Sequence, residues 1–254
     1  MASDPPGRAL AAFAALAVLV PALVLGGAAM AQEISLDFGD GGSLTLRTVQ
    51  IFVLVTLLSL APGLAIMLTC FPFMVTVLSI LRQAVGVQQA PPNMMIVSLA
   101  LFLTYFVMEP VFTEAWTAGV VPLTDGTITP EQAFPRVMAP FRVFMSSRVD
   151  PDTLQTLALA AARPVGPVAE APLAVLVPAF LLSEIQRGFE VGFLIFLPFL
   201  VIDLVIAAIL MSMGMLMVPP AIVSLPFKLV FFVLADGWTL LAGSLVESYS
   251  RSPI

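Results

Sequence analysis

The hydrophobic positions of this chain fall into four long blocks that are separated by more polar connections. The blocks occupy residues 48–81, 94–108, 173–210 and 221–246. The first block exceeds the roughly 20 residues that a helix needs to cross a bilayer, and Pro62, Gly63 and Pro72 predict a kink or an end within it. Sustained apolar runs predict an all-α membrane protein with about four long apolar helices that pair as hairpins.

The connection 109–170 is much more polar and contains four arginines and seven carboxylates. Thr129, followed by proline and, three residues on, by Gln132, has the order of a capping box at a helix start. Asp150, which also precedes a proline, predicts a second helix start. We expect short amphipathic helices in this polar insert.

The N-terminal residues 1–31 have the order of a secretory signal peptide: a positively charged flank, an Ala/Val/Leu-rich run and an Ala-Met-Ala ending. Cleavage is expected before Gln32. An uncleaved membrane anchor is the alternative, because the apolar run is slightly long. We interpret 32–47 as an exported polar lead-in and 48–254 as the helical membrane domain, with the polar insert inside it.

Composition narrows the chemistry that this chain can perform. It is 60% hydrophobic and 10% charged, whereas a soluble domain has about 25% charged residues. It has no His and a single Cys, Cys70, which excludes an imidazole base, a histidine-held metal and an intrachain disulfide. We expect no catalytic residue, no cofactor, no metal and no nucleic-acid binding, and Cys70 is interpreted as a packing residue.

A four-span topology conflicts with the distribution of arginines. If Gln32 begins outside the membrane, four crossings place 82–93 inside and 109–170 outside. The insert contains four arginines and the loop contains one, which is opposite to the usual retention of positive loops in the cytoplasm. Either the insert is long enough to escape that tendency, or the hairpins do not span the bilayer in the ordinary way.

Charged residues inside the third block need partners, because each costs about 2.5–3.5 kcal/mol at the centre of a membrane helix. Glu184, Arg187 and Glu190 follow one another at a spacing of three residues. Arg187 can therefore reach both carboxylates on one helical face. We interpret the three as a self-neutralised charge stripe at an interface, and a contact surface for another subunit is the alternative.

A second pair of charges connects the third and fourth blocks. Asp203 and Lys228 lie at equal distances from the connecting turn near 212–220, so a hairpin places them at similar depth. We predict a buried ion pair that fixes the register of the hairpin. A proton relay of the kind found in transporters is the alternative.

The connecting turn contains MSMGMLMVPP, residues 211–220, with Met at every second position from 211 to 217. Gly214 and the double proline favour a broken helix there. Methionine is flexible and polarizable, so it can repack around changing shapes. These residues are either apolar filler or a deformable ring, formed by several copies around an axis, that blocks ions and parts for a large substrate.

Three segments carry a resemblance to a known family. They are LRQAVGVQQAPPN (81–93), VPAFLLSEIQRGFEVGFLIFLPFLVIDLVIAAILMSMGMLMVPP (177–220) and SLPFKLVFFVLADGWTLLAGSL (224–245). They resemble the FliP family of the bacterial flagellar type III secretion export gate, over roughly 48–110 and 137–250. The first segment contains the loop motif, whose residues are Arg82, Gln83, Gly86, Gln88, Gln89, Pro91, Pro92 and Asn93.

The resemblance implies an assembly rather than a single subunit. Family members carry a signal peptide, and five copies join FliQ and FliR family subunits in a helical cone. FlhA and FlhB belong to the same apparatus, at the flagellar basal body in the inner membrane. The hairpins of the cone largely do not behave as ordinary bilayer spans. Unfolded flagellar subunits pass through its channel.

The resemblance also implies a role for the methionine turn as a gasket around the closed pore. Carried over by position, the gasket consists of Met215, Leu216 and Met217. Many relatives have a third Met where this chain has Leu216. In 69–78, relatives usually carry an Arg that this chain lacks, so no role of that Arg transfers here.

We therefore expect a non-enzymatic core channel subunit that is needed for flagellum assembly. An injectisome export-gate homologue is one alternative. A proton-coupled small-solute carrier that uses Asp203 and Lys228 is another, although carriers usually show an internal duplication that is not evident in this sequence.

Overall fold

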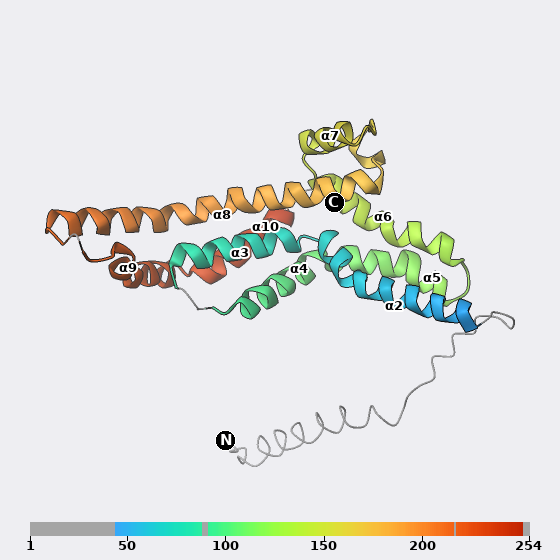
Figure 1. The fold of residues 1–254 in the computed structure, drawn as a ribbon, viewed down its shortest axis with the longest axis horizontal. Coiled ribbons are helices and arrows are strands. Elements are labelled where there is room, and N and C mark those ends of the chain that lie inside the picture. The colour runs from blue at the N-terminus through green and yellow to red at the C-terminus, as the bar shows by residue number, and fades with distance from the viewer. Residues whose placement is uncertain (1–43, 88–90, 216, 251–254) are drawn as a thin grey trace, which may run out of the picture. The chain divides into compact units, whose positions relative to one another are not determined.

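The computed structural model describes residues 44–87, 91–215 and 217–250 (Figure 1). These residues form helices and connecting segments without a strand, which confirms the all-α prediction. The predicted signal peptide 1–31 and the greater part of the lead-in lie outside the described residues. The chain divides into two units, 1–56 and 57–254. Helix α2 (Leu44–Met67) crosses this division, and the packing described below belongs to the second unit.

The first apolar block forms two helices rather than one. Helix α2 ends at Met67, and α3 (Phe71–Val85) begins after a three-residue connection. Pro72 occupies the first turn of α3, where its missing N–H has no helical partner to lose. The predicted break at Pro72 is confirmed, whereas Pro62 and Gly63 lie inside α2.

The second block extends well beyond its predicted end at residue 108. Helix α4 (Asn93–Ala115) continues through a π-helical turn, η1 (Trp116–Val120), into α5 (Val121–Thr124). Pro110 lies inside α4 instead of ending it. Val111 and Ala115 are buried, and α4 packs against the next long helix, α6 (Pro130–Arg148). This tertiary packing outweighs the local preference of proline to end a helix.

The polar insert begins its helices where the sequence predicted. Helix α6 (Pro130–Arg148) follows Thr129, whose N–H donates to Gln132 Oε1 at 3.4 Å. Helix α7 (Pro151–Ala160) follows Asp150, whose Oδ2 accepts from the Thr153 N–H at 2.8 Å. A short 3-10 turn, η2 (Val168–Glu170), leads into the third block.

The third block forms one helix and the fourth forms two. Helix α8 (Leu173–Ser212) is 40 residues long and is followed by α9 (Pro220–Leu234) and α10 (Gly237–Ser250). Helices α9 and α10 meet at a bend of 61°. Helix α3 packs along α8 (Figure 1), and their approach is close: a Cβ on Gly192 would lie 2.4 Å from Ile80 Cδ1.

Among the described residues, two helical segments are long and apolar enough to cross a membrane. They are Asn93–Thr124 and Leu173–Ser212, and the bent α9–α10 pair makes a third if it is counted as one span. The first block also contains a long apolar helix, α2, with 24 residues. That block divides, and α3 has only 15 residues.

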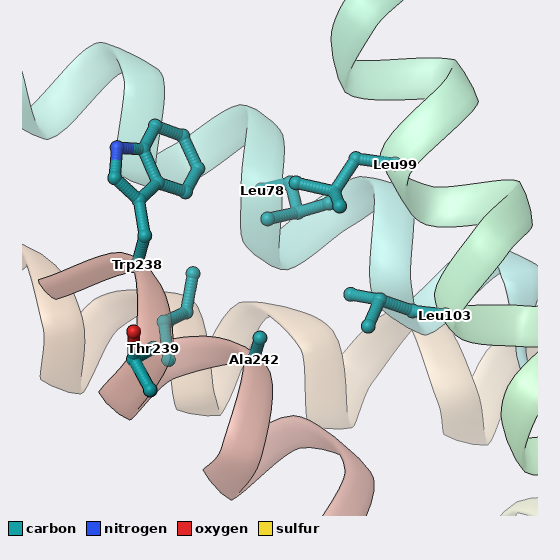
Figure 2. A pocket seen from close by; sticks show the side chains of 7 residues that line it. Leu78, Leu99, Leu103, Trp238, Thr239 and Ala242 are labelled. Carbon is teal, nitrogen blue, oxygen red and sulfur yellow. The ribbon is translucent and has the colours of Figure 1, made fainter. Parts of the chain in front are cut away.

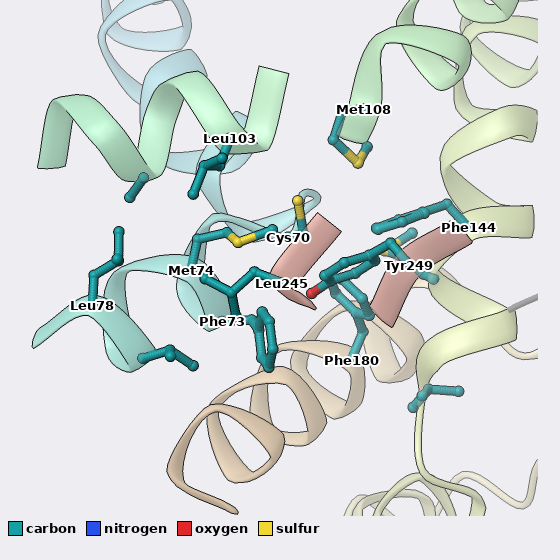
Figure 3. Close-up of a cluster of buried hydrophobic side chains, with 14 of the residues drawn as sticks. Cys70, Phe73, Met74, Leu78, Leu103, Met108, Phe144, Phe180, Leu245 and Tyr249 are labelled. Atoms are coloured by element: carbon teal, nitrogen blue, oxygen red, sulfur yellow. The ribbon is translucent and has the colours of Figure 1, made fainter. Parts of the chain in front are cut away.

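The hydrophobic core gathers at one end of α8 and draws on α3, α4, α6, α8 and α10 (Figure 3). Phe73 and Met74 of α3 meet Phe180 of α8 and Leu245 of α10, and all four are fully buried or nearly so. Cys70 lies in the same core with no exposed surface. Burial of this kind agrees with a packing role for the thiol.

Candidate functional site

Helix α8 ends in a Schellman motif that turns the chain toward α9. The Gly214 N–H donates to the Met211 carbonyl at 3.0 Å, and the Met215 N–H donates to the Leu210 carbonyl at 3.0 Å. Gly214 has φ +74°, a conformation that glycine adopts without the steric cost of a Cβ. The broken geometry expected from Gly214 is present, and Met211 still belongs to the helix.

The side chains of this turn are exposed in the single chain. Met211, Met213, Met215 and Met217 expose between 41% and 96% of their surface. Leu216, the middle residue of the predicted gasket, lies outside the described residues. A contiguous exposed apolar patch of this kind is typical of an interaction surface. The turn therefore presents a tip of exposed, flexible apolar side chains, called the methionine tip below.

Below the tip, the structure brings Asp203 and Lys228 together across the α8–α9 hairpin. Lys228 Nζ lies 2.7 Å from Asp203 Oδ2. Ser224 Oγ donates to the other carboxylate oxygen, Oδ1, at 2.5 Å. The Lys228 side chain is 7% exposed and that of Asp203 is 31% exposed. The pair thus ties one turn of α8 to two successive turns of α9.

A third element completes this site. Lys228 Nζ also donates to the Ala84 carbonyl at 3.0 Å, in the last turn of α3, where free carbonyls favour a cation. Gly86 ends α3 with φ +84°, and a Cβ there would lie 3.7 Å from Lys228 Nζ. The role of Ala84 could not be predicted from the sequence, because a backbone acceptor has no side-chain signature.

The structure places the loop motif beside this ion pair. Arg82 Nη1 donates to Asn93 Oδ1, which links the end of α3 to the start of α4. Pro92 is the N-cap of α4, preceded by the half-buried Pro91, and Gln83 is exposed. Gln88 and Gln89 lie outside the described residues. The motif thus fixes the connection between two helices at the point where α9 docks.

A second charged cluster lies near the start of α8 and has Glu184 at its centre. Its Oε1 lies 3.2 Å from Arg148 Nε and 3.2 Å from Arg187 Nη1. Its Oε2 accepts from the Tyr249 hydroxyl. The Arg148 guanidinium lies 4.1 Å from the centre of the Tyr249 ring. Glu184 has no exposed surface, so this cluster ties α6, α8 and α10 together inside the core.

The expected charge stripe of Glu184, Arg187 and Glu190 does not form as one surface. Arg187 Nη2 donates to the Arg148 carbonyl at 3.2 Å, and exposed Glu190 accepts from Gln186 Nε2 at 3.1 Å. Helices α6 and α10 cover Glu184, which removes it from any outer face. The sequence analysis missed Arg148 and Tyr249 as its partners because they are 36 and 65 residues away.

Chemically, the two charged clusters join helices together. In the part of the chain that the structure describes, no group of three or more His, Cys, Asp or Glu side chains could hold a metal ion. The Asp203–Lys228 pair fixes the register of the α8–α9 hairpin. The hairpin ends in exposed, flexible methionine side chains.

Comparison with known proteins gives a consistent result. The FliP family model matches residues 54–245. The flagellar biosynthetic protein FliP of Caulobacter vibrioides is 51% identical over 243 residues, which cover 95% of this chain and 91% of that protein. The protein of the same name from Agrobacterium fabrum is 48% identical over 92% of this chain and 98% of its own length. That of Bacillus subtilis is 44% identical over 80% and 92%.

Proposed function

Because the chain belongs to the FliP family, we propose that it is a core channel subunit of the flagellar type III export gate. In this role it passes unfolded flagellar subunits across the bacterial inner membrane, at the flagellar basal body, and is needed for flagellum assembly. Its relatives are flagellar biosynthetic proteins, and its long apolar helices associate it with a membrane.

One observation carries this proposal: an exposed methionine tip at the end of a hairpin whose register is fixed. Met215 and Met217 are exposed, and the Asp203–Lys228 pair holds the two helices behind them in register. Several copies around an axis would bring their tips together and, with Leu216, close the axis with flexible apolar side chains. Such a gasket excludes ions at rest and repacks around a passing polypeptide.

The proposed partners follow from the apolar surface that a single chain leaves uncovered. Large apolar side chains are exposed along α8, among them Phe189, Phe193, Leu194 and Leu204. We propose that further copies, five in all, and subunits of the FliQ and FliR families cover part of this surface and that lipid covers the rest. FlhA, FlhB and the exported flagellar subunits are the transient partners. The proposed role is non-enzymatic.

The geometry supports the two alternative functions less well. A proton relay needs a carboxylate that binds and releases protons, but Asp203 is held by both Lys228 and Ser224. Both carboxylate oxygens are used to join α8 to α9, which favours a structural role. An injectisome homologue would have the same hairpin, and the names of the relatives favour the flagellar system.

Native mass spectrometry of the detergent-extracted complex, co-expressed with its FliQ and FliR family neighbours, tests this proposal. We expect several copies of this chain together with both neighbours in one particle. Asp152→Asn, at an exposed position of the polar insert, is the control that should leave the subunit composition unchanged. A lone chain that binds a small solute would contradict the proposal.

A further inference from the structure

An apolar groove runs between α4 and α10, away from the methionine tip. Three adjoining cavities of about 240, 270 and 620 Å³ form it. The first two share Leu99 and Trp238, and the second and third share Leu103 and Ala242. In Figure 2, Trp238 of α10 and Leu99 of α4 stand on opposite walls, with Leu78 of α3 between them at the back. The groove is therefore continuous.

The length of the groove matches one leaflet of a bilayer. On α4 its lining extends from Met95 to Phe106, which is about 17 Å at the rise of an α-helix. The hydrocarbon of a bilayer is about 30 Å thick, so one leaflet is about half of that. The groove also lies along the first half of Asn93–Thr124, a candidate membrane span.

A cationic side chain, Arg82, lies near the end of the groove where α4 begins. Arg82 is the only charged residue between 48 and 108. It donates to Asn93, two residues before Met95 in the groove wall. Arg82 and Gln83 also line a small, more polar hollow of about 270 Å³. An apolar groove with a guanidinium at one end is complementary to an amphiphile with an anionic head.

We propose that the groove binds one acyl chain of an anionic phospholipid whose phosphate lies at Arg82. The sections of 240–270 Å³ are lined almost entirely by apolar side chains, which suits a methylene chain. Trp238 packs edge-on against Phe232 with ring centres 5.3 Å apart, which holds its indole on the groove wall. This site does not depend on whether the methionine tip closes a channel.

Quenching of Trp238 fluorescence by brominated lipids tests the site. The chain has two tryptophans, so Trp116→Phe in the full-length protein leaves Trp238 as the sole emitter. Quenching is measured in vesicles of brominated phosphatidylglycerol mixed with unlabelled phosphatidylcholine, and again with the labels exchanged. We expect the quenching to show a roughly fivefold higher affinity for phosphatidylglycerol, the ratio expected for one arginine at an anionic surface.

Variants test the phosphate contact at Arg82 and the apolar groove separately. Arg82→Gln should remove the preference for phosphatidylglycerol, while Arg82→Lys should retain it. Ala242→Phe should fill the groove and reduce the quenching by both lipids severalfold. Leu240→Phe adds a ring on the same helix at an exposed position outside the groove lining and should leave quenching unchanged.

Three results would overturn the proposal. Equal quenching by both lipids in the Trp116→Phe protein would exclude a site for an anionic head. An unchanged signal in Ala242→Phe would place the lipid outside the groove. Absence of quenching by any lipid would show that protein covers the groove, either a second copy or a neighbouring subunit.

Discussion

Two of the three carboxylates of α8, Glu184 and Asp203, lie in opposite surroundings, although they share one helix. Glu184 is fully buried and has partners from α6, α8 and α10. Asp203 follows it by 19 residues, about 28 Å along the helix, and has partners from α9 alone. One end of α8 is therefore anchored in the core, and the carboxylate at the other end is held only across the α8–α9 hairpin.

This difference separates the part of the chain that forms the core from the part that we propose meets other chains. Near Glu184, one face of α8 buries large side chains such as Phe180 and Leu176, whereas beyond Asp203 most are exposed, as Leu204 and Val205 show. A region with few buried contacts opens at lower free energy than the core does. The methionine tip thus lies in the region where a change in side-chain packing costs the least free energy.

The largest effect should come from breaking the buried cluster. Glu184→Gln leaves the guanidinium of Arg148 without its carboxylate in a site closed to water, and loss of one partner of a buried ion pair costs about 3–5 kcal/mol. We expect a loss of this size in the free energy of unfolding, measured by denaturant titration in detergent. Glu190→Gln, one and a half turns away and exposed, should change it by about 0.5 kcal/mol or less. Equal effects of both variants would refute the buried anchor.

The hairpin pair should contribute less, because Asp203 is partly exposed to screening. In a double-mutant cycle of Asp203→Asn and Lys228→Met, we expect a coupling energy of about 0.5–1.5 kcal/mol. Unfolding of the two single variants and of the double variant measures it. Strictly additive effects would show that the two side chains act independently.

Exchange of the two charges sharpens the same comparison. With Lys at 203 and Asp at 228, the new carboxylate would face the Ala84 carbonyl and the C-terminal end of α3, which repel an anion. We expect the exchanged pair to recover only part of the stability that each single variant loses. Full recovery, measured by the same unfolding titration, would show that the α3 contact contributes nothing.

The turn itself should show a smaller effect that arises from the backbone alone. Gly214→Ala forces an alanine to φ +74°, where no atom lies within 4 Å of the new Cβ, so the cost of about 1 kcal/mol is conformational. Gly243→Ala is a suitable control, because it also has open space around it but lies inside a helix. We expect it to stabilise by about 0.5–1 kcal/mol. The same sign for both variants in thermal unfolding would contradict this account.

The smallest effect should be the pH dependence of the α7 cap. Hydrogen bonds from the Thr153 hydroxyl and then from its N–H lower the pKa of Asp150 below its ordinary 3.8. Because the pKa of Asp150 is lower in the folded chain than in the unfolded chain, its carboxylate stabilises the fold at pH values above the unfolded pKa. This contribution is lost as the pH falls through the folded pKa. In a plot of the thermal unfolding midpoint against pH, Asp150→Asn should therefore reduce the slope at acidic pH. An unchanged profile would rule out a role for this carboxylate.

Local features of the fold could be predicted from the sequence. Thr129 and Asp150 begin helices because their side chains act within three residues. The proximity of Asp203 and Lys228 follows from counting residues on either side of one turn. The bend between α9 and α10 was missed although Asp236-Gly237 is a turn signal, and Asp236 has φ +47°.

Long-range contacts could not be predicted, since no periodicity records them. Arg148 belonged to a polar insert, and nothing in its neighbourhood indicated burial against Glu184 and Tyr249. The passage of α4 through Pro110 depends on packing against α6, which lies later in the chain. The turn at the methionine tip could be predicted from Gly214 and the double proline, whereas the bond from Lys228 to the Ala84 carbonyl could not.

Ion conductance of the assembled complex tests most directly whether the methionine tips close a channel. The complex, co-expressed with its FliQ and FliR family neighbours, is reconstituted in planar bilayers and compared with a variant that carries Met215→Ser and Met217→Ser. Met211→Ser is the matched control, because Met211 is also exposed but lies within α8. We predict that the double variant leaks small ions while the control and the parent stay closed. Conductance that is equal in all three would contradict the account.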